Sequence, residues 1–437
     1  MTTAKINLDA LWMPYTANRA FKKNPRIIVG AEGLYFHTDD GRKVFDSLSG
    51  LWCTGAGHNV PEIRDAVAKQ LGTLDFSPNF QFGHPLSFQL AERITELMPD
   101  GLNHVMFTNS GSEAADTSLK IARAYWRQAG QPNKTRLIGR VKGYHGVNFG
   151  GASVGGIGAN RKAFGPLLDV DHLPSTLLAE NAFTAGMPQS GEYLAEHLLE
   201  LINLHDASNI AAVIVEPMSG SAGVVVPPHG YLARLREICT AHDILLIFDE
   251  VITGFGRCGA NTGAAAFGVV PDMINVAKQL TNGAVPMGAV VVTEAIYAFM
   301  ASDLPEHAIE LPHGYTYSGH PVACAAALAA LDVFERDNLA QRAGAVAVDF
   351  ERLIHELRGS PHVVDIRNYG LAGAIQLAPR DGDPIVRPYE VGLAMWQAGF
   401  YVRWGGDTLQ FGPPFESPVS VLAEMFDRLG TELHSLK

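Results

Sequence analysis

The chain has 437 residues, enough for two or three domains around a large buried core. Its net charge of -12, with no basic run, argues against a nucleic-acid surface, and no stretch approaches the roughly 18 consecutive apolar residues of a membrane span. Four cysteines without metal-ligand spacing, and an N-terminus unlike a signal peptide, predict a cytoplasmic protein with reduced thiols and no metal site.

The first 60 residues are expected to form an arm and a small sheet. The stretch 34–46, LYFHTDDGRKVFD, predicts a hairpin that turns at Asp40 and Gly41. A helix is predicted to begin at Pro61, because proline is tolerated in the first helical turn. Residues 61–320 are predicted to form a large domain.

The segment 104–127 is predicted to be a strand followed by a helix. Ser110 and Glu113 have the spacing of a capping box, which alone would explain both residues. Ser110, Gly111 and Ser112 also offer hydroxyls and unpaired backbone N–H groups at a helix N-terminus. Such a turn can bind an anion.

Two further predicted strands lead into polar groups. The stretch 136–156 predicts a strand and then a glycine-rich loop that carries Tyr144, whose ring can stack on an aromatic ligand, and His145. His145 would serve equally well as a structural hydrogen-bonding residue. A strand over 211–215 ends at Glu216, which we expect to order neighbouring groups by hydrogen bonding.

The apolar run 244–248 predicts a strand buried on both faces, as in a parallel sheet. It ends at Asp249, and ligands collect beyond the carboxyl ends of such strands. A carboxylate there needs a cation or strong donors to stay ionised. An aspartate that caps a helix or forms a turn would produce the same pattern.

A second apolar run, 273–277, ends at Lys278. Burial lowers the pKa of a lysine and leaves a free amine, which suits Schiff-base chemistry, although a surface lysine could also end a strand. Asp249 and Lys278 on nearby strands match the needs of pyridoxal phosphate: the carboxylate pairs with the pyridine nitrogen, and the lysine holds the aldehyde as an imine and moves the proton. In that setting the turn at Ser110–Ser112 is predicted to hold the cofactor phosphate.

Residues 321–437 are predicted to form a smaller α+β domain that packs with the N-terminal arm. An alanine-rich helix after residue 320 could pack against a second subunit or within the chain. Arg403 lies in a strand pair, where its planar guanidinium could grip a carboxylate with two hydrogen bonds. An ordinary strand arginine is the alternative.

The stretches IFDEVITGFGR (247–257) and INVAK (274–278) closely resemble the class III, or omega, aminotransferases of the pyridoxal phosphate fold type I superfamily. The resemblance covers nearly the whole chain. It is strongest to the beta-alanine:pyruvate branch in the stretches WMPYTANR, LSGLWCTGAGH, PHGYTYSGHPVACAA and VRWGGDTLQFGPPF. It implies an α/β fold, with a mostly parallel seven-stranded sheet between helices in the large domain and a small α+β C-terminal domain.

The resemblance also implies roles for individual residues. Arg403 would bind the substrate carboxylate, and Thr316 would reach across a dimer interface to the cofactor phosphate of the other subunit. Trp52 and Tyr15 are expected to wall the substrate pocket together with Tyr144. A homodimer is implied, and a tetramer is left open. The expected cofactor contacts are Ser110, Gly111, Ser112, Tyr144, His145, Glu216, Asp249, Val251, Lys278 and Thr316.

One position departs from other branches of this family. Ornithine- and 4-aminobutyrate-type relatives carry a second glutamate in a pattern like EPxxGE, where this chain has Ser221. We therefore expect amino transfer from beta-alanine or another omega-amino acid to pyruvate, giving L-alanine and malonate semialdehyde or a corresponding product. The open alternatives are taurine:pyruvate or broad amine:pyruvate transfer, a decarboxylase, racemase or aminomutase on the same cofactor, and a non-enzymatic binding protein.

Overall fold

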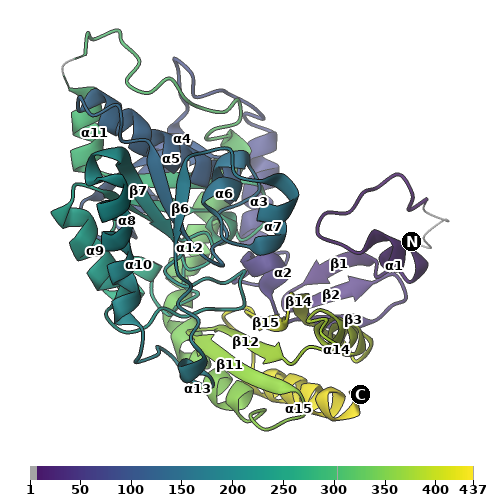
Figure 1. The fold of residues 1–437 in the computed structure, drawn as a ribbon. Coiled ribbons are helices and arrows are strands. Elements are labelled where there is room, and N and C mark those ends of the chain that lie inside the picture. The colour runs from purple at the N-terminus through teal and green to yellow at the C-terminus, as the bar shows by residue number, and fades with distance from the viewer. Residues whose placement is uncertain (1–6, 303, 437) are drawn as a thin grey trace.

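A computed structural model describes residues 7–302 and 304–436 of the chain. They build one seven-stranded sheet and two four-stranded sheets. Figure 1 shows the large sheet enclosed by helices, with the two small sheets below and beside it. In this described part of the chain, no helix combines the length and the apolar character needed to cross a membrane.

The large sheet has the strand order β4-β10-β9-β8-β7-β5-β6. Neighbouring strands are parallel except around β10, which is antiparallel to both β4 and β9. The apolar runs predicted from the sequence are confirmed as its central strands. The strands are β4 (Leu102–Thr108), β5 (Arg136–Arg140), β6 (Val170–Leu173), β7 (Ile210–Val215), β8 (Leu245–Asp249), β9 (Met273–Val276) and β10 (Gly288–Thr293).

Helices cover both faces of this sheet, so its strands are apolar on both sides. On one face Ile247 belongs to the same buried apolar cluster as Leu119 of α5, and on the other Phe248 belongs to the same cluster as Leu235 of α9. Because side chains alternate along a strand, Asp249 faces the same side as Ile247. The helices around the sheet are α3 (Pro61–Leu71), α4 (Pro85–Glu96), α5 (Gly111–Gln128), α6 (Phe149–Val154), α7 (Gly158–Phe164), α8 (His197–His205), α9 (Tyr231–Ala241), α10 (Gly263–Phe267) and α11 (Glu294–Ala301).

Short 3-10 helices lie in the connections of the large sheet. They are η1 (Ala179–Asn181), η2 (Glu192–Glu196), η3 (Ala207–Asn209) and η4 (Lys278–Thr281). The helix α6 corrects the sequence prediction for 136–156, which had only a strand followed by a glycine-rich loop. Its glycines allow the close packing: a Cβ on Gly151 would lie 2.0 Å from the carbonyl oxygen of His145.

The first small sheet joins the two ends of the chain. It contains β1 (Ile28–Glu32), β2 (Tyr35–Thr38), β3 (Lys43–Asp46) and β13 (Phe400–Tyr401). The predicted hairpin is confirmed, since β2 and β3 pair antiparallel, and β13 adds in parallel to β3. The short helices α1 (Asn18–Lys23) and α2 (Ser49–Trp52) flank this sheet.

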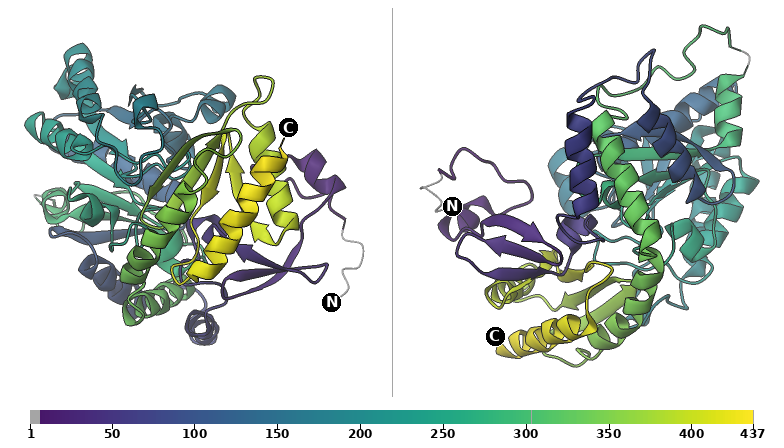
Figure 2. Two further views of the ribbon diagram at one scale, coloured as in Figure 1. Left: turned by 90° about the horizontal axis from the view of Figure 1, so that it is seen from below. Right: turned by 180° about the vertical axis from the view of Figure 1, so that it is seen from behind.

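The second small sheet is antiparallel, in the order β11-β12-β15-β14, and helices pack on it (Figure 2). The long helix α12 contacts α3, α4 and α13, and so connects this part of the chain to the large one. The domain boundaries predicted at residues 60 and 320 stay predictions. The elements are α12 (Pro321–Arg336), α13 (Leu339–His355), β11 (Val363–Tyr369), β12 (Ala372–Leu377), α14 (Val386–Gln397), β14 (Arg403–Gly405), β15 (Thr408–Phe411) and α15 (Val419–Ser435).

Candidate active site

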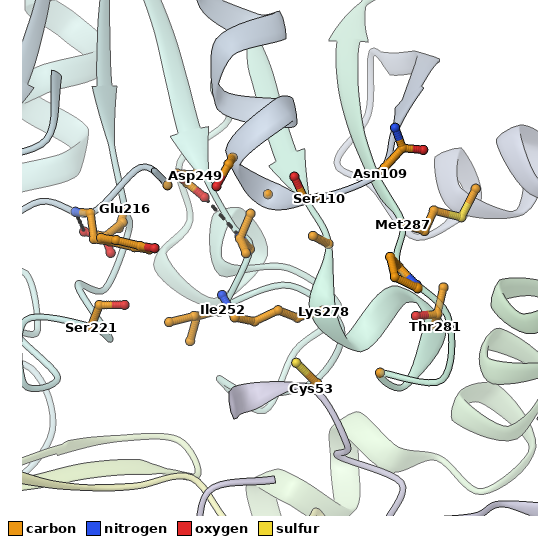
Figure 3. A pocket seen from close by; sticks show the side chains of 18 of the residues that line it. Cys53, Asn109, Ser110, Glu216, Ser221, Asp249, Ile252, Lys278, Thr281 and Met287 are labelled. Atoms are coloured by element: carbon orange, nitrogen blue, oxygen red, sulfur yellow. Dashed lines mark hydrogen bonds between the residues drawn. The ribbon is translucent and has the colours of Figure 1, made fainter. Parts of the chain in front are cut away.

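A cavity of about 330 Å³ lies at the carboxyl edge of the large sheet. Its walls come from the ends of β8 and β9, the start of α5, and the loops after β5, β7 and β9 (Figure 3). Segments far apart in the sequence therefore meet there, as expected where the carboxyl ends of parallel strands gather. The sequence-predicted residues that line it are Ser110, Gly111, Ser112, Tyr144, Glu216, Asp249, Val251 and Lys278.

Asp249, the last residue of β8, is 5% exposed and held from two sides. Its Oδ2 lies 2.8 Å from Nδ1 of His145, and its Oδ1 accepts the backbone N–H of Val251 at 3.2 Å. His145 is itself buried and does not line the cavity. The structure thus places His145 behind Asp249, where it fixes the direction of the carboxylate.

Lys278 enters the same cavity from the neighbouring strand. Asp249 pairs with Asn275 across β8 and β9, and Lys278 follows β9 at the start of η4. Burial lowers the pKa of Lys278 below its ordinary value, although the charges of Asp249 and Glu216, together with Cys53, favour its protonated form. In Figure 3 the lysine side chain lies between Asp249 and Cys53.

The loop that carries Lys278 is clamped to the N-terminal segment. The backbone N–H of Gly55 donates to Oε1 of Gln279 at 2.7 Å, and the N–H of Ala56 donates to Oδ1 of Asn282 at 3.0 Å. Lys278 has a φ of 47°, in the left-handed region that non-glycine residues rarely occupy. These contacts hold the amine in place against backbone strain.

The start of α5 forms the predicted anion-binding turn. Ser110 caps the helix by accepting the N–H of Glu113 at 3.2 Å, while Oε2 of Glu113 reaches back to the N–H of Asn109 at 2.7 Å. The N–H groups of Gly111 and Ser112 have no partner within the helix, because the first helical amides lack one. They can donate to an anion in the cavity.

Two side chains beside this turn suit contact with a flat ring. Tyr144 lines the cavity, and its backbone N–H donates to Oε2 of Glu216 at 3.2 Å. Val251 lines it next to Gly111, where a Cβ would come within 2.8 Å of the valine methyl groups. Burial raises the pKa of Glu216 to about 6 and that of Tyr144 to about 12.

These groups fit pyridoxal phosphate. The cavity offers amide donors for a phosphate, a buried carboxylate for a pyridinium and an amine for an aldehyde, each from a different element. Asp249 is buried with neutral backbone on one side and a histidine on the other, so a cationic ring nitrogen would match its charge. No group of three or more His, Cys, Asp or Glu side chains within residues 7–302 and 304–436 could hold a metal ion.

Trp52 is buried next to Cys53 and is not among the residues that line this cavity, so its predicted role in walling the substrate pocket stays a prediction. Its ring is 4% exposed and packs against Gly412, where a Cβ would lie 2.2 Å from the ring. The guanidinium of Arg257 lies 5.6 Å from the ring centre. The glycine at 412 leaves room for the indole there, and the next residue, Cys53, lines the cavity instead.

The other three predicted residues, Tyr15, Arg403 and Thr316, do not line the cavity either. Tyr15 is 71% exposed, but its hydroxyl hydrogen-bonds to Tyr144. Arg403 is half-buried, and its charge acts on both Lys278 and Tyr144, which places the guanidinium beside the cavity. Thr316 is exposed in the loop before α12, so its predicted role toward a second subunit stays a prediction.

Sequence reasoning missed one whole wall of the cavity. The loop between β9 and β10 supplies Thr281, Gly283, Val285, Pro286 and Met287. Its glycine and proline marked it as a loop, but nothing in the sequence signalled that β10 turns back along the cavity. The other lining residues that were not predicted are Cys53, Asn109, Gly146, Met218, Ser221, Ile252 and Ala277.

Known proteins share this arrangement along almost the whole chain. Residues 16–431 match the sequence family described as aminotransferase class-III. A beta-alanine–pyruvate aminotransferase of Pseudomonas aeruginosa is 66% identical over 436 residues, covering 99% of this chain and 97% of the relative. An omega-amino acid–pyruvate aminotransferase of Pseudomonas putida is 63% identical over the same length and the same shares of both chains.

Solved structures agree with the fold. The omega transaminase of Pseudomonas jessenii, in complex with PMP, superimposes with a TM-score of 0.91 at 31% identity, covering 98% of this chain and 97% of that one. The α/β architecture is therefore that of fold type I, and the cavity lies in a scaffold already known to carry this cofactor in a relative. By sequence and by structure, the chain belongs to the class III aminotransferases.

Proposed function

We propose that this aminotransferase uses pyridoxal phosphate to move the amino group of beta-alanine, or of another omega-amino acid, to pyruvate. One observation carries the proposal: Asp249, Lys278 and the turn at Ser110–Ser112 converge on a single cavity from three elements. The relatives from both Pseudomonas species, at 66% and 63% identity, are named for transfer to pyruvate from such donors.

When bound, the cofactor supplies an electron sink that stabilises the carbanion formed at the amine-bearing carbon. Asp249 would pair with the ring nitrogen of the bound cofactor and keep it positive. His145 fixes the orientation of that carboxylate. Nζ of Lys278, with its pKa lowered by burial, would take the proton from the amine-bearing carbon of the donor and pass it to the cofactor, and in the second half of the reaction would carry a proton the opposite way, to the acceptor carbon.

The substrate carboxylate is assigned to Arg403, whose guanidinium lies close enough to act electrostatically on Lys278. Ser221 lines the cavity where other branches of the family place a glutamate. A serine there neutralises no arginine, so Arg403 stays available for a monocarboxylate acceptor. This favours pyruvate over 2-oxoglutarate.

A homodimer is part of the proposal. Thr316 is exposed, and so are its neighbour Tyr317, at 57%, and Phe80, at 51%, whose ring lies beside Gly314 of the same loop. Exposed aromatic side chains that lie close together suit burial against a second protein surface. In a dimer, Thr316 would reach the phosphate of the other subunit's cofactor.

The function is tested with a panel of amino donors, each paired with pyruvate or with 2-oxoglutarate. We expect alanine from beta-alanine plus pyruvate, and at least tenfold slower transfer to 2-oxoglutarate. Lys278→Ala should abolish transfer, whereas Lys162→Ala, remote in sequence and on the helix α7, should leave it unchanged.

Full activity of Lys278→Ala would overturn the mechanism, and a preference for 2-oxoglutarate would overturn the assignment of Ser221. Product formed from the donor alone, without pyruvate, would instead indicate a decarboxylase, racemase or aminomutase.

A further inference from the structure

A second cavity, of about 280 Å³, lies between the N-terminal sheet and the C-terminal part of the chain. Neither the family assignment nor the proposed reaction uses it. Its walls are mostly aromatic and include one cation. The residues that carry the argument are Phe21, Arg26, Phe36, Trp396, Tyr401 and Trp404. We propose that this cavity binds a small carboxylate with an aromatic or aliphatic body.

Arg26 is the polar group of the cavity. Its guanidinium carbon lies 5.1 Å from the ring centre of Phe21 and 5.9 Å from that of Trp404. Stacking on ring faces leaves the N–H groups at the edge of the guanidinium free to donate. A carboxylate accepts two such donors side by side, which is the geometry that arginine presents.

The chain itself does not neutralise this cation. Within the part of the chain that the structure describes, Arg26 forms no ion pair, and the groups that act on its charge are the phenols of Tyr389 and Tyr401. Desolvation disfavours its charge, and a carboxylate in the cavity would offset that cost. Charge complementarity therefore selects an anion.

The aromatic walls select an apolar body behind that anion. Tyr401 lies edge-on to Trp396, with ring centres 6.4 Å apart, and edge-on to Phe36 at 6.2 Å. These ring contacts hold the aromatic side chains in place, and Trp396 is itself buried, with 5% of its surface exposed. A mostly apolar cavity with one well-placed polar group is typical of a small-molecule site.

Two connections lead from this cavity to the catalytic one. Gly50 lines it, and Cys53, three residues later, lines the catalytic cavity. Trp404 follows Arg403 on β14, and successive side chains of a strand point to opposite faces. A ligand against Trp404 would thus press on the strand that carries Arg403. If the proposed function holds, a carboxylate bound in this second cavity should change the KM for beta-alanine more than it changes kcat.

Binding is measured by calorimetric titration of 3-phenylpropionate, which has no amine to transfer, into the holoenzyme. The Arg403→Gln variant serves as the background, because it removes carboxylate binding in the catalytic cavity. One site per chain is expected. Adding Arg26→Gln should weaken binding at least tenfold, while adding Arg19→Gln, an exposed arginine on the preceding helix α1, should leave it unchanged.

The neutral analogue 3-phenylpropan-1-ol should bind at least tenfold more weakly than the carboxylate. Absence of binding in the Arg403→Gln background, or equal binding after Arg26→Gln, would overturn the proposal. Arg26→Lys keeps the charge, and intermediate binding by that variant would separate recognition from a folding defect. The titration does not depend on amino transfer, so a failure of the proposed function leaves its result readable.

Discussion

Asp249 and Glu250 are adjacent in the sequence, but their carboxylates point to different places and have different roles. Asp249 faces the cavity, whereas Glu250 turns away and accepts the N–H groups of Gly263 and Ala264, the latter at 2.7 Å. Glu250 thereby anchors the start of α10. It is 1% exposed, and burial raises its pKa to about 7. Only one of the two carboxylates is therefore available to a ligand.

The raised pKa of Glu250 makes stability depend on pH. A carboxyl whose folded pKa lies above the unfolded value of 4.5 contributes stability that is complete below pH 4.5 and is lost as the pH rises through about 7. We compare the parent protein with Glu250→Gln by the difference between their unfolding free energies. This difference should fall by about 3 kcal/mol as the pH rises from 4.5 to about 7. Urea unfolding at pH 4.5, 6 and 8 measures this difference.

Glu216, with its own raised pKa, is present in both proteins and cancels in this comparison. A difference that does not change with pH would refute the assignment to Glu250.

His145 should matter for cofactor binding although it does not line the cavity. His145→Ala removes the hydrogen bond to Asp249, and bonds to charged groups contribute about 1.5–3 kcal/mol. We expect pyridoxal phosphate to bind about 10–100-fold more weakly, as measured by titrating the apoenzyme and following cofactor absorbance. His197→Ala, at an exposed histidine, is the control. A dissociation constant within twofold of the parent value would contradict this role.

At the scale of elements, the anion-binding turn depends on a loop from another strand. The loop after β5 packs on the first turn of α5, where the N–H of Val147 donates to Oγ of Ser112 at 3.1 Å. Gly146 has a φ of 91°, and a Cβ there would lie 2.4 Å from that same oxygen. The turn thus keeps its shape because glycine stands opposite it.

Gly146→Ala should weaken binding of pyridoxal phosphate at least tenfold, because the added methyl group displaces Ser112. Gly130→Ala is a matched control: it also has a positive φ, of 75°, but a Cβ there meets nothing within 4 Å. Both variants carry backbone strain of about 1–3 kcal/mol, and only the first touches the turn. Equal cofactor affinity in the two variants would show that the packing onto Ser112 is unimportant.

At the scale of the molecule, Arg257 ties three parts of the chain together. This buried guanidinium donates to the carbonyl of Leu371 at 3.1 Å, to that of Pro413 at 2.7 Å and to Oγ of Ser49 at 3.1 Å. Burial lowers its pKa to about 10. The large sheet, the N-terminal segment and the C-terminal sheet therefore share one cation.

Arg257→Met keeps the volume but leaves these three acceptors without their donor. Unsatisfied buried acceptors cost about 1–3 kcal/mol each, so we expect the unfolding free energy to fall by about 3 kcal/mol or more. Urea unfolding checks this, with Arg64→Met, at an exposed position, as the control. Equal midpoints for the two variants would contradict a joining role for Arg257.

The sequence was informative where a local pattern determines the structure. Strands 245–249 and 273–276 could be predicted because parallel strands buried on both faces are continuous apolar runs, and their last residues then had to lie at one edge. Contacts between distant segments, in contrast, produce no local pattern in the sequence. Nothing in the local sequence indicates that the two-residue strand β13 pairs with Phe45, or that the ring of Trp52 packs against Gly412.

The reversed direction of β10 bears on how this enzyme could acquire new substrates. Antiparallel neighbours need only a short loop between them, whereas parallel ones need a helical crossover. That loop begins at Lys278 and forms one side of the cavity as far as Met287. Lengthening or shortening this loop would change the size of the catalytic cavity while every strand kept its place. Mutagenesis that aims at bulkier amines can therefore concentrate on one continuous segment of the gene.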